Sequence, residues 1–368
     1  MAGNRRRAFT MAALALAAAL ASGFAGKAAA NPYIVVDANT DRVLFAEEPF
    51  RRWYPASLTK LMSAYLAFSD IKAGLLDKNS VVTFSAAAAN EPATKMYFAP
   101  GARVTLDSAL KMMLVHSAND AARALAESSP GGRDVFIQRM NATAAKLGMA
   151  DTHFVNANGM SSMSNPQPGQ YTTARDMAVL ALAIERDFPE YLYYFKIPGI
   201  ASNSGRYRNT NLLIGNFDGA TGMKTGYVCA SGYNQVSTAT RDGKAVVVVA
   251  LGTMTIPERA ELSAKLLQAG LTTTERNGPL ISGYLPTEPV DAAVADITSS
   301  TCSQAAMEAK AGLIDEDGDY VLNSPYLKPI PDDFATVDAF RLPNDTEMAS
   351  STLDSLTIVP LPYARPVQ

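Results

Sequence analysis

Two side chains with the chemistry of a nucleophile and a base stand three residues apart in the stretch 54–62. Ser57 and Lys60 form an S-x-x-K pair just after Pro55. Residues i and i+3 lie on one face of a helix, and proline is typical of a first helical turn. Free backbone N–H groups at a helix N-terminus favour an oxyanion nearby. We therefore predict that Ser57 attacks and that Lys60 is its base.

Lys60 accepts a proton only when it is neutral, and burial beside a second cation would lower its pKa far enough. An S-x-x-K pair alone also fits a capped helix with a solvated lysine. Two further motifs are candidates to complete a site: S-x-N at Ser117 and Asn119, and K-T-G at residues 224–226. Each alone also fits a plain structural role, as a helix-end cluster or a glycine-rich turn.

The elements that must position these motifs follow from the hydrophobic pattern. Residues 33–47 predict a hairpin, residues 226–238 and 245–251 predict strands, and a helix should run from Pro257 to about Gln268. The region between, 75–217, has helical spacing. We expect an α+β fold in which N- and C-terminal strands form one antiparallel sheet with an inserted helical subdomain. The cleft should lie where the two meet.

Charge and composition exclude several function classes. Residues 1–30 have three arginines, a short apolar run and an alanine-rich end, which predicts an export signal and a periplasmic or extracytoplasmic protein. Residues 285–368 hold 14 acidic and four basic side chains, so the body before them is mildly cationic. That charge suits a small anionic substrate, and no basic stripe indicates nucleic acid.

The three motifs in this order are typical of penicillin-binding proteins and class A β-lactamases. The sequence resembles the low-molecular-mass penicillin-binding proteins, the serine D-alanyl-D-alanine carboxypeptidases, from about Tyr33 to Gly270. This resemblance implies a β-lactamase/penicillin-binding-protein-like catalytic domain at 31–275, followed by an acidic, proline-containing extension at 276–368. Further segments that are similar to the family lie at 140–141, 147–154, 158–159, 169–177 and 209–213.

The resemblance also implies a role for each motif residue. Ser57 is acylated with Lys60 as base, Ser117 relays a proton to the leaving amine, and Asn119 holds Lys60 and the substrate amide. Lys224 is the second cation and attracts the terminal carboxylate of the peptide.

Four more residues complete the implied substrate site. Thr225 hydrogen-bonds the carboxylate, Gly226 permits close approach to the backbone, and the N–H groups of Ser57 and Tyr227 form the oxyanion hole. Arg259 faces the carboxylate, although a solvated helix charge fits that residue equally well.

The implied function is the removal of the terminal D-alanine from peptidoglycan stem peptides ending in D-Ala-D-Ala, with β-lactams as covalent inhibitors and no cofactor. A catalytically weak peptidoglycan-binding or scaffold protein, or a D,D-endopeptidase, is the alternative. His116 and His153 do not stand in a serine-hydrolase motif, and no H-E-x-x-H motif indicates a metal. A class A β-lactamase needs a glutamate after the S-x-N motif, and none occurs between Glu127 and Glu185.

The extension after residue 275 differs from that of many relatives. Its prolines break any long helix, and no basic amphipathic helix that would anchor it to a membrane is visible. Residues 315–319 predict a solvated acidic turn, because the spacing does not fit a calcium loop. Export favours a bond between Cys229 and Cys302, while a buried, reduced Cys229 with a free Cys302 is the alternative.

Overall fold

The computed structural model describes residues 31–160, 169–311, 313 and 320–343. The chain divides into two units, Met1–Asn31 and Pro32–Gln368, and the helices and strands described below lie in the second. The predicted export signal at 1–30 and the acidic turn at 315–319 lie outside the described residues. No helix in the described ranges has both the length and the apolar character needed to span a membrane.

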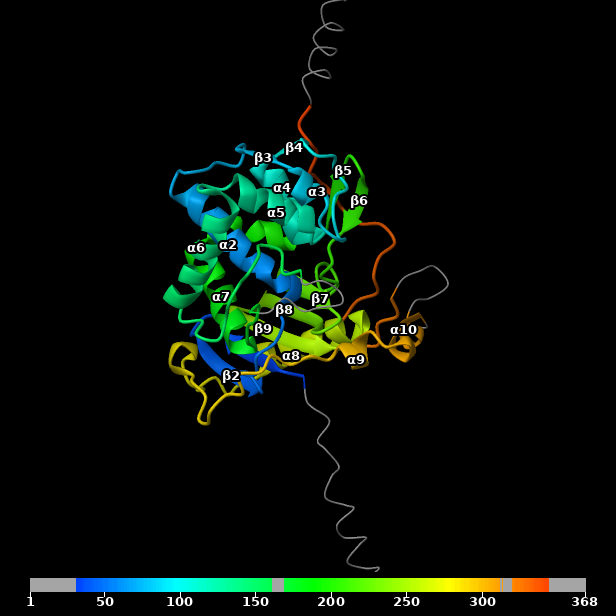
Figure 1. The fold of residues 1–368 in the computed structure, drawn as a ribbon. Coiled ribbons are helices and arrows are strands. Elements are labelled where there is room, and N and C mark those ends of the chain that lie inside the picture. Colours follow the sequence, from blue (N-terminus) through cyan, green and yellow to red (C-terminus); the bar gives the residue numbers. More distant parts are fainter. Residues whose placement is uncertain (1–30, 161–168, 312, 314–319, 344–368) are drawn as a thin grey trace, which may run out of the picture. The chain divides into compact units, whose positions relative to one another are not determined.

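The centre of the second unit is a five-stranded sheet in the order β2-β1-β9-β8-β7 (Figure 1). All four strand pairs are antiparallel, and β1 lies between β2 and β9. The predicted pairing of N- and C-terminal segments in one antiparallel sheet is therefore confirmed. The strands are β1 (Tyr33–Asp37), β2 (Arg42–Glu47), β7 (Ala220–Val228), β8 (Gly232–Arg241) and β9 (Lys244–Thr253).

The prediction of one strand over 226–238 is wrong, because two strands occupy this region. A turn at residues 229–231, in which Ser231 N–H donates to the Val228 carbonyl, reverses the chain between β7 and β8. The first strand also begins six residues earlier than predicted, at Ala220, so K-T-G lies inside an edge strand. Residues 220–225 show no clear apolar alternation, since several of their polar groups face the cleft.

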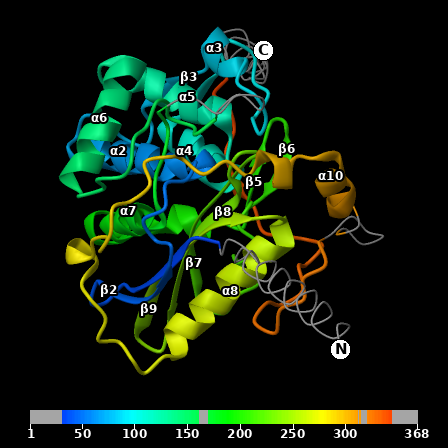
Figure 2. The ribbon, with the colours of Figure 1, turned by 60° about the horizontal axis from the view of Figure 1, so that its bottom comes forward.

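Both faces of the sheet are covered, as Figure 2 shows for α8 (Ile256–Thr272) on one side and α7 (Ala174–Asp187) on the other. Val246 and Val248 of β9 pack with α8, whereas Val247 and Val249 join the core of the helical side. A strand buried on both faces needs an unbroken apolar sequence, which explains the valine run in β9. Thr255 caps α8 by accepting a hydrogen bond from Glu258 N–H.

The inserted subdomain is largely helical, as predicted, but it also contains short strands. Its helices are α2 (Lys60–Lys72), α3 (Ala86–Ala89), α4 (Leu106–Val115), α5 (Asn119–Ser128), α6 (Gly132–Lys146) and the 3-10 helix η2 (Pro189–Lys196). Two small sheets pair β3 (Val81–Thr83) with β4 (Arg103–Thr105), and β5 (Gly199–Ser202) with β6 (Gly205–Arg208) and β10 (Val337–Asp338). Strands of two to four residues are too short to produce a recognisable alternation in sequence.

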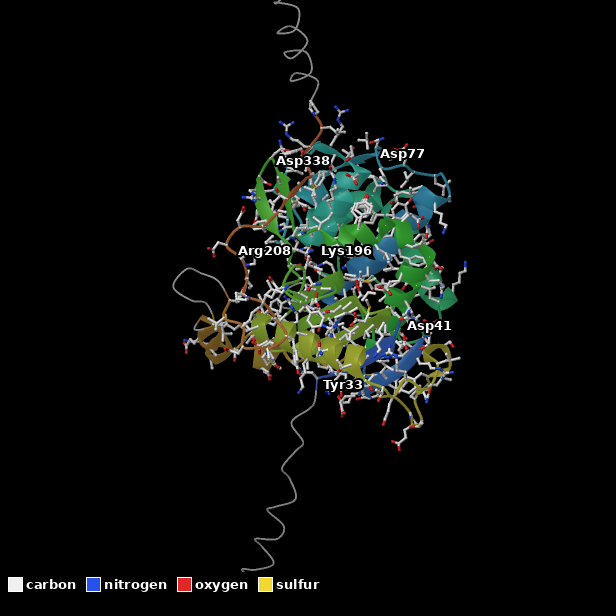
Figure 3. The ribbon with its side chains drawn as sticks, turned by 180° about the vertical axis from the view of Figure 1, so that it is seen from behind. Tyr33, Asp41, Asp77, Lys196, Arg208 and Asp338 are labelled. Carbon is white, nitrogen blue, oxygen red and sulfur yellow. A yellow bond between two sulfur atoms is a disulfide. The ribbon has the colours of Figure 1, made fainter. Side chains whose placement is uncertain are left out.

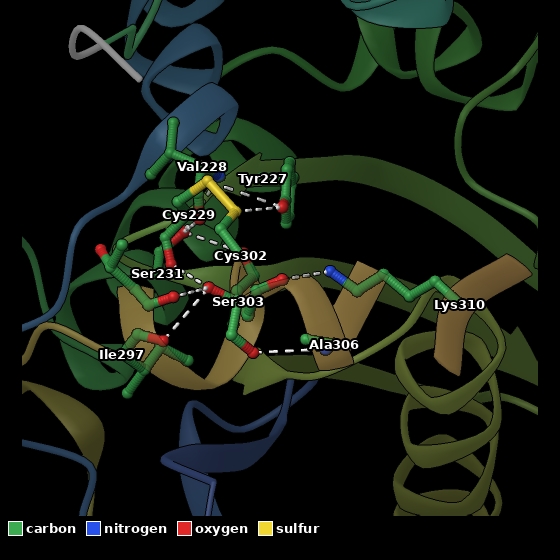
Figure 4. Close-up of a disulfide and its surroundings, with 12 residues drawn as sticks. Tyr227, Val228, Cys229, Ser231, Ile297, Cys302, Ser303, Ala306 and Lys310 are labelled. Atoms are coloured by element: carbon green, nitrogen blue, oxygen red, sulfur yellow. Dashed lines mark hydrogen bonds between the residues drawn. A yellow bond between two sulfur atoms is a disulfide. The ribbon is translucent and has the colours of Figure 1, made fainter. Parts of the chain in front are cut away.

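The C-terminal extension is linked to the sheet by a disulfide. Cys229, in the turn after β7, is bonded to Cys302, with 5.6 Å between their Cα atoms (Figure 4). The predicted bond is confirmed, and the alternative of two free thiols is wrong. Cys302 follows α9 (Thr298–Thr301) and precedes α10 (Gln304–Ala311); the short helix η3 (Ile281–Gly283) lies upstream.

We expect removal of this disulfide to destabilise the protein. The double variant Cys229→Ala/Cys302→Ala should lower the free energy of unfolding by up to ~4 kcal/mol, because the bond closes a long loop in the unfolded chain. Urea denaturation of the mature protein measures the change. Two free thiols in the denatured, unreduced wild type would contradict the bond itself.

Candidate active site

The chain around Ser57 forms a tight turn against the edge strand. Ser57 lies in the 3-10 helix η1 (Ala56–Thr59), which begins after Pro55 and continues into α2. A Cβ atom placed on Gly226 of β7 would lie 3.0 Å from both the Ser57 nitrogen and the Pro55 carbonyl oxygen. Glycine at 226 therefore lets the K-T-G strand pack directly on the backbone of Ser57.

The Lys60 amine lies one turn along the same face and is fully buried. Its Nζ is 2.7 Å from each of three oxygens: Ser57 Oγ, Asn119 Oδ1 and the Asn158 carbonyl. The two carbonyl-type oxygens only accept hydrogen bonds, so they would take both N–H groups of a neutral amine. The remaining lone pair would then point at Ser57 Oγ, which is the geometry of a general base.

Burial lowers the pKa of Lys60 to about 7, although the nearby carboxylates of Glu91 and Asp120 act in the opposite direction. A buried ammonium loses its hydration, which favours the neutral form. Near neutral pH a substantial fraction of Lys60 is thus unprotonated, as a base must be. Burial is the main cause of this shift, whereas the sequence led us to expect a large effect of a second cation.

The S-x-N motif occupies the junction between α4 and α5. Ser117 has a positive φ of 64°, and Asn119 begins α5. Asn119 Nδ2 donates to the Pro92 carbonyl at 2.9 Å, which fixes the amide so that Oδ1 faces Lys60. The turn between the helices thereby brings both motif side chains to the same end of the cleft as Ser57.

The K-T-G lysine completes this arrangement from the sheet side. Lys224 Nζ donates to Ser117 Oγ and to the Thr225 carbonyl, both at 2.8 Å, and the side chain is buried. Burial and repulsion from Lys60 and Arg259 lower the pKa of Lys224 well below its usual value. Lys224 thus links the K-T-G strand to the S-x-N turn through Ser117.

Arg259 of α8 is buried at the other end of the cleft. Its Nη2 donates to the Thr210 carbonyl at 3.0 Å, and Thr225 Oγ1 donates to Thr210 Oγ1 at 2.9 Å. Its Nε is buried and has no hydrogen-bond partner among the described residues, and burial lowers its pKa to about 10. A buried guanidinium with a free donor is suited to a carboxylate ligand.

A cavity of about 500 Å³ joins these groups. Side chains from both the sheet and the helical subdomain line it, as expected for a cleft between the two. The structure thus brings together all the predicted site residues: Ser57, Lys60, Ser117, Asn119, Lys224, Thr225, Gly226, Tyr227 and Arg259.

Comparison with known proteins shows to which family this chain belongs. A family model described as D-alanyl-D-alanine carboxypeptidase (Peptidase_S11) matches residues 18–255. The chain belongs to this family. D-alanyl-D-alanine carboxypeptidase DacA of Escherichia coli K12 is 34% identical over 269 residues, which are 71% of this chain and 66% of that protein. The chain thus spans about two thirds of the length of this curated relative.

Solved structures give the same result for the fold. D-alanyl-D-alanine carboxypeptidase DacD from Francisella tularensis is 33% identical with a TM-score of 0.63, over 66% of this chain and 70% of that one. Penicillin-binding protein D2 from Listeria monocytogenes, in its ampicillin-bound form, is 28% identical with a TM-score of 0.60, over 67% and 99% respectively. The protein therefore has the α+β fold of these solved carboxypeptidase and penicillin-binding-protein structures.

Sequence reasoning missed two groups of this site. The Asn158 carbonyl accepts from Lys60, and the Asn158 side chain donates to Glu91 Oε2 at 2.9 Å. Thr210 links Thr225 to Arg259. Both residues stand in segments that are similar to the family. However, they act largely through backbone carbonyls, which have no signature of residue type.

His116 lies next to Ser117 but does not act as a serine-hydrolase histidine would. Its ring lies 4.1 Å, between centroids, from that of Tyr207. Burial and the charge of Lys224 lower its pKa to about 4. Lys60, not this histidine, is the basic side chain in contact with Ser57.

Proposed function

We propose that this protein is a D-alanyl-D-alanine carboxypeptidase that acts through an acyl-enzyme at Ser57. The observation that supports it most is the Ser57–Lys60 contact of 2.7 Å in a site that also holds two buried basic side chains, Lys224 and Arg259. Among the described residues, neither basic side chain forms an ion pair with a carboxylate. A substrate that ends in a free carboxylate would supply the missing anion.

In the proposed acylation, neutral Lys60 takes the Ser57 proton while Oγ attacks the carbonyl carbon of the penultimate D-alanine. The oxyanion accepts hydrogen bonds from the backbone N–H groups of Ser57 and Tyr227. The C–N bond then breaks as Ser117, which Lys224 contacts, passes its proton to the leaving amine and receives the proton that Lys60 took from Ser57, so Lys60 is neutral again. D-alanine departs and an ester remains on Ser57.

Deacylation reverses these roles. Water replaces D-alanine, Lys60 removes its proton, and the resulting attack releases the shortened peptide with Ser57 restored. The substrate carboxylate beside Lys224 and Arg259 would favour the protonated form of Lys224. Lys60 would then be the neutral member of the pair, as the reaction requires.

A β-lactam presents a carboxylate and a reactive amide in the same arrangement. It would acylate Ser57 and leave no departing fragment, so the adduct should clear slowly. The ampicillin-bound structure of the Listeria monocytogenes relative supports this inhibition.

We place the substrate outside the cytoplasm, as stem peptides of peptidoglycan, because residues 1–30 have the pattern of an export signal. The catalytic domain would span 31–275 and the extension 276–368, a boundary that keeps α8 with its Arg259 in the catalytic domain. Release of D-alanine from a D-Ala-D-Ala pentapeptide, with mass mapping of a labelled penicillin, tests the activity. Penicillin binding without D-alanine release would favour the scaffold alternative.

The Lys60 pKa of about 7 predicts how acylation depends on pH. Below this value the amine is protonated and cannot accept from Ser57, so kcat/KM for penicillin acylation should fall about tenfold for each pH unit between 6 and 5. Above about 7 the rate should level off. Stopped-flow measurements with a chromogenic β-lactam follow the profile. A rate that is constant, or that rises, as the pH falls from 7 to 5 would contradict this role.

A further inference from the structure

Residues 320–342, here called the C-terminal strap, connect the two sides of the cleft. On the sheet side, Asn323 N–H donates to Glu261 Oε1 of α8, and Lys328 N–H donates to the Asn216 carbonyl at 2.9 Å. On the side of the helical subdomain, β10 pairs in parallel with β5, and Lys111 Nζ of α4 donates to the Asp338 carbonyl at 3.0 Å. The strap is therefore held at both ends.

Between these ends the strap runs beside the cleft. Arg208, one of the residues that line the cleft, donates through Nη2 to the Pro331 carbonyl at 2.5 Å. The Phe334 ring lies 5.0 Å from the Arg206 guanidinium and 4.4 Å from that of Arg208. Figure 3 labels Arg208 and Asp338, both on the side along which the orange strap runs. These contacts fix the course of the strap past the carboxylate end of the site.

The first residue of the strap, Tyr320, lines the cleft itself. It is half-buried and shares the wall of the cavity with Arg259 and Thr225. It is also close enough to Arg259 to influence the pKa of that guanidinium, opposing the effect of burial. Tyr320 lies well beyond residue 255, where the family match ends. The part of the cavity wall that includes Tyr320 is therefore formed by the C-terminal extension.

The position of Tyr320 in the cleft indicates which part of a bound substrate would lie near it. If the scissile carbonyl lies at Ser57 and the terminal carboxylate at Thr225 and Arg259, the leaving residue lies between them. The side chain of the leaving residue would have to fit into the space beside the part of the cavity wall that includes Tyr320. A methyl group needs little room, whereas an aromatic side chain, or a second peptide attached through a cross-link, needs much more.

We infer that Tyr320 of the C-terminal strap restricts the leaving group to a single small D-amino acid, and so makes the enzyme a carboxypeptidase in preference to an endopeptidase. This inference rests on the function proposed above. It makes Tyr320 a specificity-determining residue that sequence motifs do not reveal.

The test compares leaving groups in the full-length mature protein. Tyr320→Ala should raise kcat/KM for a D-Ala-D-Phe peptide relative to a D-Ala-D-Ala peptide by ~10-fold to ~100-fold, the range expected when a pocket loses a steric restriction. Cleavage of a cross-linked muropeptide dimer should rise in parallel. Tyr320→Phe keeps the ring and should retain the wild-type ratio.

Tyr326→Ala is the matched control, because this tyrosine of the same strap is 42% exposed and does not line the cavity. In this variant, the ratio of kcat/KM for the D-Ala-D-Phe peptide to kcat/KM for the D-Ala-D-Ala peptide should equal the wild-type ratio. Melting temperatures and penicillin labelling verify that each variant is folded and has an intact nucleophile.

An unchanged ratio in Tyr320→Ala, with normal D-alanine release, would overturn this inference alone. Failure of the wild type to release D-alanine would instead overturn the proposed function, and the inference with it.

Discussion

The variant Ser57→Ala is expected to lose both penicillin labelling and D-alanine release. Ser57 is the hydroxyl in contact with the buried Lys60 amine, and Gly226 packs on its backbone, so its removal leaves the site without a nucleophile. Loss of the nucleophile in another serine peptidase lowers kcat on the order of 10⁶-fold. Mass spectrometry of the labelled protein and a D-alanine assay measure the two effects.

Ser69→Ala is a suitable control for this variant. Ser69 belongs to the same helix α2, and its hydroxyl donates to the Tyr65 carbonyl at 2.8 Å, away from the cleft. It should label and turn over as the wild type does. A penicillin adduct on Ser117, or full labelling of Ser57→Ala, would show that the nucleophile is another residue.

The second large effect is expected for Lys60→Arg. Arginine preserves the positive charge but remains protonated, so it cannot take the Ser57 proton. Acylation should fall by ~10²-fold to ~10⁴-fold, the contribution expected of a general base. The bulkier guanidinium must also fit among Ser57, Asn119 and Asn158, so the melting temperature should be measured with the acylation rate.

Lys72→Arg provides the comparison, since Lys72 ends the same helix and is exposed. That exchange should leave acylation unchanged. If Lys60→Arg were folded and acylated at a near-normal rate, Lys60 would not be the base. Lys224 would then be the next residue to examine, because its amine contacts Ser117.

Much of the fold was predictable because its signals are local. The β1–β2 hairpin has its own turn, α8 has a proline at its start, and β9 is a valine run that only a strand buried on both faces requires. The K-T-G strand was only partly recognised. Its polar side chains serve the cleft and so interrupt the alternation by which a strand is identified in sequence.

The sequence by itself determined which side chains could do chemistry, since Ser57, Lys60, Ser117 and Lys224 occur in motifs with short, regular spacing. Tertiary packing alone decided that the Asn158 carbonyl contacts Lys60, that Thr210 joins Thr225 to Arg259, and that Tyr320 lines the cleft. Lys60 and Arg259 contact backbone carbonyls, which every residue possesses, and the two threonine hydroxyls come from separate segments that no motif pairs. The third depends on a strap held by contacts between residues more than 60 positions apart, and no local pattern encodes such distances.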